Sequence, residues 1–188
     1  IGLLALYVLL LALLYRGLFL DDASIVFRYV DNLLSGHGLT FNPPARVEGI
    51  TDVGWVLLLA PFTRLLGAPV AAKFLGIAGL GLTFFYIDRA ARSSGDARLP
   101  FFALALTASH ADLVTFSLLG METSALAALL VGLIVLAGRA PDSPALPLLA
   151  AAGSLLHPEA VLVYPFAVLF SQRFHWRNAL LFGSTLAG

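Results

Sequence analysis

Two adjacent carboxylates, Asp21 and Asp22, follow the first apolar segment of the chain. Where a spanning helix meets water, such a pair can bind a divalent cation, or one carboxylate can accept a proton from a hydroxyl while the other orients it. A simpler interpretation is that Asp22 caps the helix that follows and Asp21 is only solvated, because aspartate is a favoured N-cap residue. The pair is a candidate catalytic or metal site whose meaning depends on its surroundings.

Two further charged side chains lie near apolar segments. Arg28 presents a planar fork of donors that suits a phosphate group, although it can equally pair with Asp31 on the polar face of a helix. Glu122 follows Gly120 at the start of an apolar run, where a carboxylate either serves a site or interacts favourably with a helix N-terminus. Both are candidate substrate-binding residues.

The segment His157-Pro158-Glu159 separates two short apolar runs, 145–157 and 158–171. Proline breaks a helix, and two ionisable groups are costly in lipid. We interpret the segment as the polar point where two half-depth helices meet. His157 and Glu159 are therefore site candidates, or they pair with each other.

The composition predicts a lipid environment for these residues. Sixty per cent of the 188 residues are apolar and 12% are charged, and the mean hydropathy is +0.93, values far above those of soluble domains. A net charge of zero excludes a basic field for nucleic acid, and the absence of cysteine excludes thiolate chemistry. Lipids and other membrane-embedded molecules are the expected partners.

Apolar runs predict an all-α fold, a polytopic transmembrane helical bundle, in one transmembrane domain over residues 1–188. Residues 1–20 are the expected first span, 21–52 an extramembrane loop, and 53–188 the further spans, with apolar runs at 53–66, 69–87, 100–118, 121–138, 145–157, 158–171 and 178–188. We expect the chain to be part of a longer protein.

The loop should begin with an amphipathic helix over about 23–35. At helical spacing, Val26 and Val30 share one face, and Arg28 and Asp31 share the opposite face. Such a helix lies flat on a membrane surface. We therefore expect an ordered loop rather than a linker.

Basic residues in short loops predict the orientation. Cytoplasmic loops carry an excess of lysine and arginine, which assigns two connections to that side, one with Arg89, Arg92 and Arg98 and one with Arg173 and Arg177. Counting spans from them places the 21–52 loop, residues 120–123 and residues 157–159 on the outer face. The ionisable candidates should converge there.

The stretch DDASIVFRYVDNLLSGHGLTFNP at 21–43, followed by VEGIT at 47–51 and by Trp55, resembles the first extracytoplasmic loop of GT-C glycosyltransferases. The similarity is to the bacterial polytopic branch that includes arabinofuranosyltransferase-like enzymes of mycobacteria. Gly120-Met121-Glu122-Thr123 resembles a G-[LM]-E-T element of these enzymes, and His157-Pro158-Glu159 resembles an R-P-[ED]-G element. The resemblance covers most of residues 1–160.

This resemblance implies transfer of a sugar from a polyprenyl-phosphate donor to an acceptor hydroxyl on the outer face of the bacterial cytoplasmic membrane. It implies that Asp21 or Asp22 is the general base, and it allows a divalent ion such as Mg²⁺, Mn²⁺ or Ca²⁺ at the same two carboxylates. It also places Glu48 and Thr51 at the sugar. The expected substrate-binding set is Arg28, Glu48, Thr51, Glu122, His157 and Glu159.

Departures from the family pattern favour an alternative. His157 replaces the arginine and Ala160 the glycine of the R-P-[ED]-G element, Asp52-Val53-Gly54 replaces Asn-Pro-Leu, and the long C-terminal portion of the family does not follow. A histidine meets phosphate as a cation only when protonated. The alternative is a non-catalytic GT-C-like subunit that packs in a larger membrane complex.

Overall fold

The computed structural model describes residues 2–45 and 49–166 of the chain. Every regular element in these ranges is helical, so the predicted all-α class is confirmed. The elements are α1 (Gly2–Leu14), α2 (Asp21–Leu34), α3 (Val53–Leu66), α4 (Ala68–Arg92), α5 (Leu99–Ser109), α6 (Ala111–Leu118), α7 (Thr123–Arg139), α8 (Ala145–Leu156) and a 3-10 helix (Pro158–Leu162).

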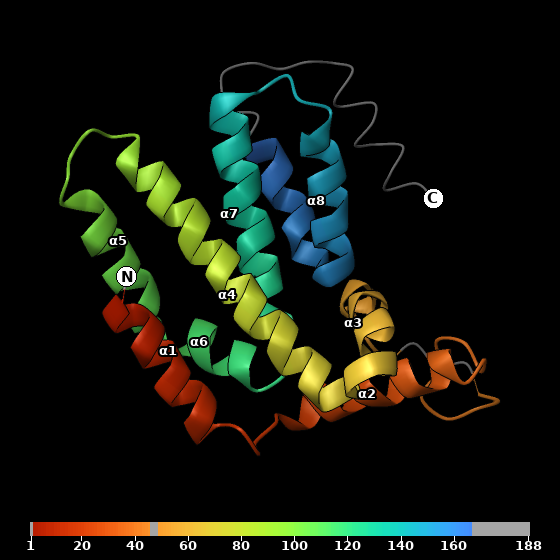
Figure 1. The fold of residues 1–188 in the computed structure, drawn as a ribbon. Helices are drawn as coiled ribbons and strands as arrows, with labels where there is room; N and C mark the ends of the chain where they lie inside the picture. Colours follow the sequence, from red (N-terminus) through yellow and green to blue (C-terminus); the bar gives the residue numbers. More distant parts are fainter. Residues whose placement is uncertain (1, 46–48, 167–188) are drawn as a thin grey trace.

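The long helix α4 is the centre of the bundle and packs against α3, α5, α6 and α7 (Figure 1). Glycines allow its closest contacts. A Cβ atom at Gly76 would lie 2.1 Å from the carbonyl oxygen of Ser117, and one at Gly79 would lie 2.6 Å from Ser124 Oγ. Ser124 Oγ also donates a 2.7 Å hydrogen bond to the Gly76 carbonyl oxygen. These small residues let the backbones approach closely, as is common between membrane helices.

The predicted amphipathic helix after the first apolar segment is confirmed as α2. It lies across the base of the bundle, crosswise to α7 and α8 (Figure 1). Val26, Tyr29 and Val30 are buried against Trp55 and Leu59 of α3, whereas the side chains on the opposite face are exposed. The apolar face therefore packs on protein.

The first helix is shorter than the predicted first span, because α1 ends at Leu14 and the chain turns before Leu20. Lys73 of α4 accounts for this turn. Its Nζ atom donates to the carbonyl oxygens of Tyr15 at 2.7 Å and Leu18 at 3.0 Å. These bonds satisfy two of the carbonyl groups that the end of α1 leaves without a partner in the helix.

Length and apolar composition identify α4 as a helix able to cross a membrane. The pair α5 and α6 is a second if it counts as one span, although its axes differ by 60° at His110. Helices α3, α7 and α8 are apolar but shorter than the roughly 20 residues that a full crossing needs. The other expected spans stay a prediction.

Candidate functional site

A pocket of about 640 Å³ lies beside the first turns of α2. Four segments line it: α2, the residues just before α3, the connection between α6 and α7, and the C-terminal end of α8. Its polar lining residues are Asp22, Thr51, Asp52, Glu122 and His157, and the others include Ile25, Val26, Gly49, Ile50 and Met121. Groups far apart in the sequence thus meet in one hollow, called the acidic pocket below.

The start of α2 positions the carboxylate pair. Asp21 and Asp22 are the first two residues of the helix, and Leu20 occupies the N-cap position without a side-chain capping bond. The interpretation of Asp22 as the cap is therefore wrong. The Leu20 N–H donates a 3.2 Å bond to the Leu119 carbonyl oxygen, which holds this helix start against the end of α6.

The two carboxylates of the pair point in different directions. Consecutive side chains on a helix are separated by about 100°, and of the two only Asp22 lines the acidic pocket. Within residues 2–45 and 49–166, no three histidine, aspartate or glutamate side chains are placed to hold one metal ion. The described side chains do not fit a metal ion by themselves, and the divalent ion stays a prediction.

Glu122 is the most deeply buried carboxylate of the acidic pocket. It occupies the N-cap position of α7, where its backbone carbonyl oxygen accepts a 2.9 Å bond from the Leu126 N–H. Its side chain is only 7% exposed, and Oε2 is buried with no hydrogen-bond partner among the described residues. An unpartnered buried carboxyl oxygen is costly unless a bound group donates to it.

Asp52 is the second buried carboxylate and is 8% exposed. It stands at the N-cap position of α3, and its backbone carbonyl oxygen accepts a 2.8 Å bond from the Trp55 N–H. Its side chain makes no capping bond. The carboxyl therefore faces the pocket as a wall residue.

Burial raises the pKa of both Asp52 and Glu122 above their ordinary values. A hydrogen bond to the residue's own backbone opposes each shift most strongly, and His157 opposes both as well. Asp52 raises the pKa of Glu122 further, and the charge of Asp22 adds to both shifts. The groups therefore respond to one another's charge. A raised pKa brings a carboxyl closer to the pH range in which it exchanges protons.

The predicted break at His157-Pro158-Glu159 is confirmed, because α8 ends at Leu156 and the 3-10 helix begins at Pro158. Proline disfavours helical geometry in the residue before it. His157 Nδ1 is hydrogen-bonded to Glu159 Oε2, which confirms that these two residues pair. The pKa of Glu159 is lowered by a backbone hydrogen bond and then by His157. Glu159 itself does not line the acidic pocket.

Arg28 and Asn32 hold the loop after α2 instead of lining the acidic pocket. Arg28 Nε donates a 3.3 Å bond to the Phe41 carbonyl oxygen. Asn32 Nδ2 donates to the carbonyl oxygens of Thr40 at 2.7 Å and Phe41 at 2.9 Å. Within the described ranges, Arg28 forms no ion pair with Asp31. The alternative pairing of these two residues is therefore not observed.

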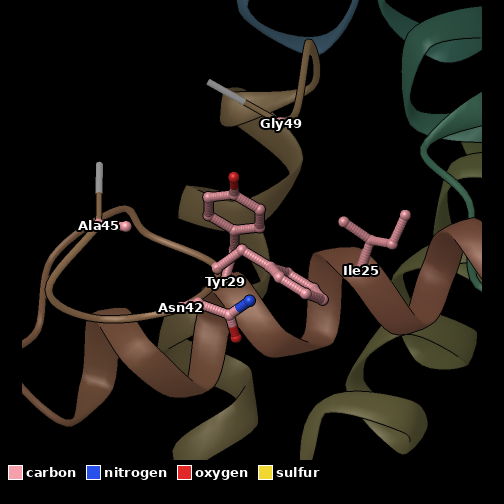
Figure 2. Close-up of a pocket in the computed structure, with 6 residues that line it drawn as sticks. Ile25, Tyr29, Asn42, Ala45 and Gly49 are labelled. Carbon is pink, nitrogen blue, oxygen red and sulfur yellow. The ribbon is translucent and has the colours of Figure 1, made fainter. Parts of the chain in front are cut away.

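A second hollow of about 340 Å³ adjoins the acidic pocket and shares Ile25 and Gly49 with it. Tyr29 and Phe41 also line it, with ring centroids 6.0 Å apart. Figure 2 shows the Tyr29 ring rising from α2 toward Gly49. A Cβ atom at Gly49 would lie 2.8 Å from the Tyr29 hydroxyl oxygen. A larger residue at position 49 would therefore require the Tyr29 side chain to shift.

The comparisons with known proteins found no counterpart. No protein-family model, curated protein or solved structure matches this chain. Function must therefore be inferred from the pocket and from the motifs that line it.

The acidic pocket contains part of the residue set expected from the sequence. The pocket brings together Asp22, Thr51, Glu122 and His157. It is not lined by Asp21, Arg28 or Glu159. Glu48 lies outside the described residues. The sequence marks Asp52 only as part of a departure from the family pattern and does not mark Lys73. Both carried a signal: Asp52 directly follows Thr51 of the family-like segment, and Lys73 is the only lysine of the chain and lies in an apolar run.

Proposed function

We propose that this chain is a membrane glycosyltransferase that moves a sugar from a polyprenyl-phosphate donor to an acceptor hydroxyl. The observation that carries the proposal is the convergence of Asp22, Asp52 and Glu122 in one pocket, with Glu122 Oε2 buried and unpartnered in the described structure. Sugars present many hydroxyl donors, and carboxylate oxygens accept them. The motif resemblance supplies the class of donor.

Asp22 is the proposed general base. Its carboxylate is exposed within the pocket, so an acceptor can reach it. The acceptor oxygen attacks the anomeric carbon, its proton passes to Asp22, and the bond from that carbon to the phosphate oxygen breaks. Polyprenyl phosphate leaves. Asp22 is preferred to Asp21 because only Asp22 lines the pocket.

The remaining polar groups bind the substrates. Asp52 and Glu122 hydrogen-bond the hydroxyls of the donor sugar, because both are buried in the wall and lack side-chain capping bonds. His157 meets the donor phosphate in place of the arginine of related motifs. The hollow beside Tyr29 and Phe41 extends the site along α2 and offers the exposed ring of Phe41 to a second sugar ring.

We place the protein in the bacterial cytoplasmic membrane with the acidic pocket at the outer face. Large apolar side chains are exposed on several helices, such as Leu3 and Leu65, each 83% exposed, and Leu106, 75% exposed. Lipid is the solvent that tolerates this exposure. The arginine-bearing end of α4 lies opposite α2 (Figure 1), in keeping with a cytoplasmic position for that end. A lipid donor then reaches the pocket from the bilayer.

Asp22→Asn tests the proposal, and Asp21→Asn is its matched control. The assay measures transfer of label from polyprenyl-phosphate arabinose, mannose and glucose in membranes that contain the full chain. Asp22→Asn should lower the transfer rate by about 10²–10⁴-fold, the usual contribution of a general base, while Asp21→Asn should leave it nearly unchanged. Transfer that survives in Asp22→Asn, or no transfer from any donor, would overturn the assignment.

The pairing of His157 with Glu159 favours a second candidate, a non-catalytic subunit of a larger membrane complex. With its Nδ1 atom engaged, His157 is a poorer phosphate ligand than an arginine fork. In that case no donor is consumed. Asp22→Asn would then leave the assembly of the complex unchanged, and disruption of α2 would weaken it.

A further inference from the structure

A third pocket, of about 410 Å³, lies between α4, α7 and α8, near the C-terminal ends of α4 and α7. This end of the bundle is opposite α2 (Figure 1). Arg89 and Arg139 line its polar part, and Phe85, Tyr86, Leu129 and Leu149 contribute to its apolar wall. We call it the arginine pocket. The proposed sugar transfer does not use it.

Neither arginine of this pocket forms an ion pair in the described part of the chain, and the one carboxylate whose charge acts on Arg89 is that of Asp88. Arg139 Nη2 donates a 3.3 Å bond to the Arg89 carbonyl oxygen, so its guanidinium lies against the last turn of α4. The adjacent Asp88 is already engaged, because both of its carboxylate oxygens accept bonds from Arg92 at 2.6 Å and 2.9 Å. Two positive charges therefore face one hollow without a paired carboxylate.

The wall below the arginines is apolar and has room because of Gly132. A Cβ atom at position 132 would lie 3.2 Å from the Tyr86 ring, so a larger residue there would reduce the volume of the arginine pocket. Arginines near helix C-termini interact favourably with the helix dipole and also mark the cytoplasmic side. These effects explain their presence at this end, but not their convergence above one apolar hollow. The combination matches an anion that carries a hydrocarbon chain.

We propose that the arginine pocket binds an anionic phospholipid, with the phosphate between Arg89 and Arg139 and an acyl chain along the apolar wall. Guanidinium groups match phosphate oxygens in geometry, and basic pockets between membrane helices bind anionic head groups. The site shares only the membrane setting with the proposed sugar transfer. It lies at the opposite end of the bundle from Asp22.

The test is native mass spectrometry of the full chain in a neutral detergent, titrated with phosphatidylglycerol, phosphatidylcholine or glycerol phosphate. We expect phosphatidylglycerol to bind well above the other two. Arg89→Gln should raise its Kd about fivefold, and the Arg89→Gln/Arg139→Gln double variant about 20-fold or more, as expected for charges at an anionic head group. Arg98→Gln, which removes an equal charge from the α4–α5 connection outside the pocket, should change Kd by less than about twofold.

Three results would overturn the proposal. Equal binding of phosphatidylcholine would show no selection for the anionic head group, and equal binding of glycerol phosphate would show that the acyl chain has no site. An Arg98→Gln effect as large as that of Arg89→Gln would show only general surface attraction. If the double variant does not fold, Arg89→Gln carries the test, because the Arg89 side chain makes no hydrogen bond or ion pair in the described structure. Sugar transfer stays measurable whatever the lipid result.

Discussion

The indole Nε1 of Trp55 donates a 3.1 Å hydrogen bond to the carbonyl oxygen of Gly120. Trp55 is fully buried, and Gly120 has a positive φ of 100°. The bond joins the chain just after Asp52 to the chain just before Glu122. It therefore holds both buried carboxylates of the acidic pocket in one wall.

Replacing Trp55 with phenylalanine should loosen this wall. Trp55→Phe keeps most of the apolar volume but removes the only N–H of the side chain, which leaves a buried carbonyl group without that donor. We expect a loss of about 1–3 kcal/mol in unfolding free energy and a fall in sugar transfer. Thermal unfolding in detergent measures the first effect. A midpoint equal to that of the parent protein would show that the bond does not hold the wall.

The raised pKa of Glu122 predicts how stability depends on pH. The Glu122 carboxyl keeps its proton to a higher pH in the folded chain than in the unfolded chain. The protonated carboxyl therefore favours folding at low pH. That contribution is lost as the pH rises through the folded-state pKa. Glu122→Gln should therefore flatten the fall of the unfolding midpoint that begins as the pH rises above 4.5, the ordinary pKa of a glutamate.

Asp31→Asn is the matched control for Glu122→Gln, because Asp31 is an exposed carboxylate on α2. Its pH profile should follow that of the parent protein. If the pH profile of Glu122→Gln also follows that of the parent protein, burial does not raise the pKa of the Glu122 carboxyl.

Lys73 should be among the most sensitive positions of the chain. Its ammonium group donates to the carbonyl oxygens of Tyr15, Leu18 and Leu118 and lies 4.3 Å from the centre of the Phe19 ring. Lys73→Met keeps the apolar stem and removes these bonds, which should cost roughly 3 kcal/mol or more of stability, since bonds to charged groups contribute about 1.5–3 kcal/mol each.

Arg64→Met is the control for Lys73→Met, because Arg64 is an exposed cation on α3. Its free energy of unfolding in detergent should stay within about 0.5 kcal/mol of the parent value, as is usual for surface positions. Equal effects of the two changes would mean that the Lys73 bonds add no stability.

Two glycines of α4 form a matched pair for testing helix packing. A Cβ atom at Gly76 would clash with the Ser117 carbonyl oxygen, whereas one at Gly81 meets no atom within 4 Å. Gly76→Ala should destabilise the chain by about 1–3 kcal/mol through overpacking. Gly81→Ala should be neutral or stabilising by up to about 1 kcal/mol, from helix propensity. A neutral Gly76→Ala would show that α4 and α6 can separate freely.

Features set by local spacing could be predicted from the sequence. The apolar composition predicts helices, the spacing of Val26 and Val30 predicts the amphipathic helix α2, and Pro158 predicts the break after α8. Each depends on residues within about one or two turns of one another. The pairing of His157 with Glu159 was left open by the sequence for the same local reason, and geometry decided it.

Only the tertiary structure decided which of these residues share a site. Of Asp21 and Asp22, only Asp22 lines the acidic pocket, because both residues belong to the first turn of α2 and their side chains point in different directions. The start of α2 is held by the hydrogen bond from Leu20 to the backbone of Leu119. Asp52 joins Glu122 because Trp55 reaches Gly120, and α1 ends early because Lys73 binds carbonyl groups far from it in sequence. Such contacts depend on how helices pack in three dimensions, and no periodicity within one segment encodes them.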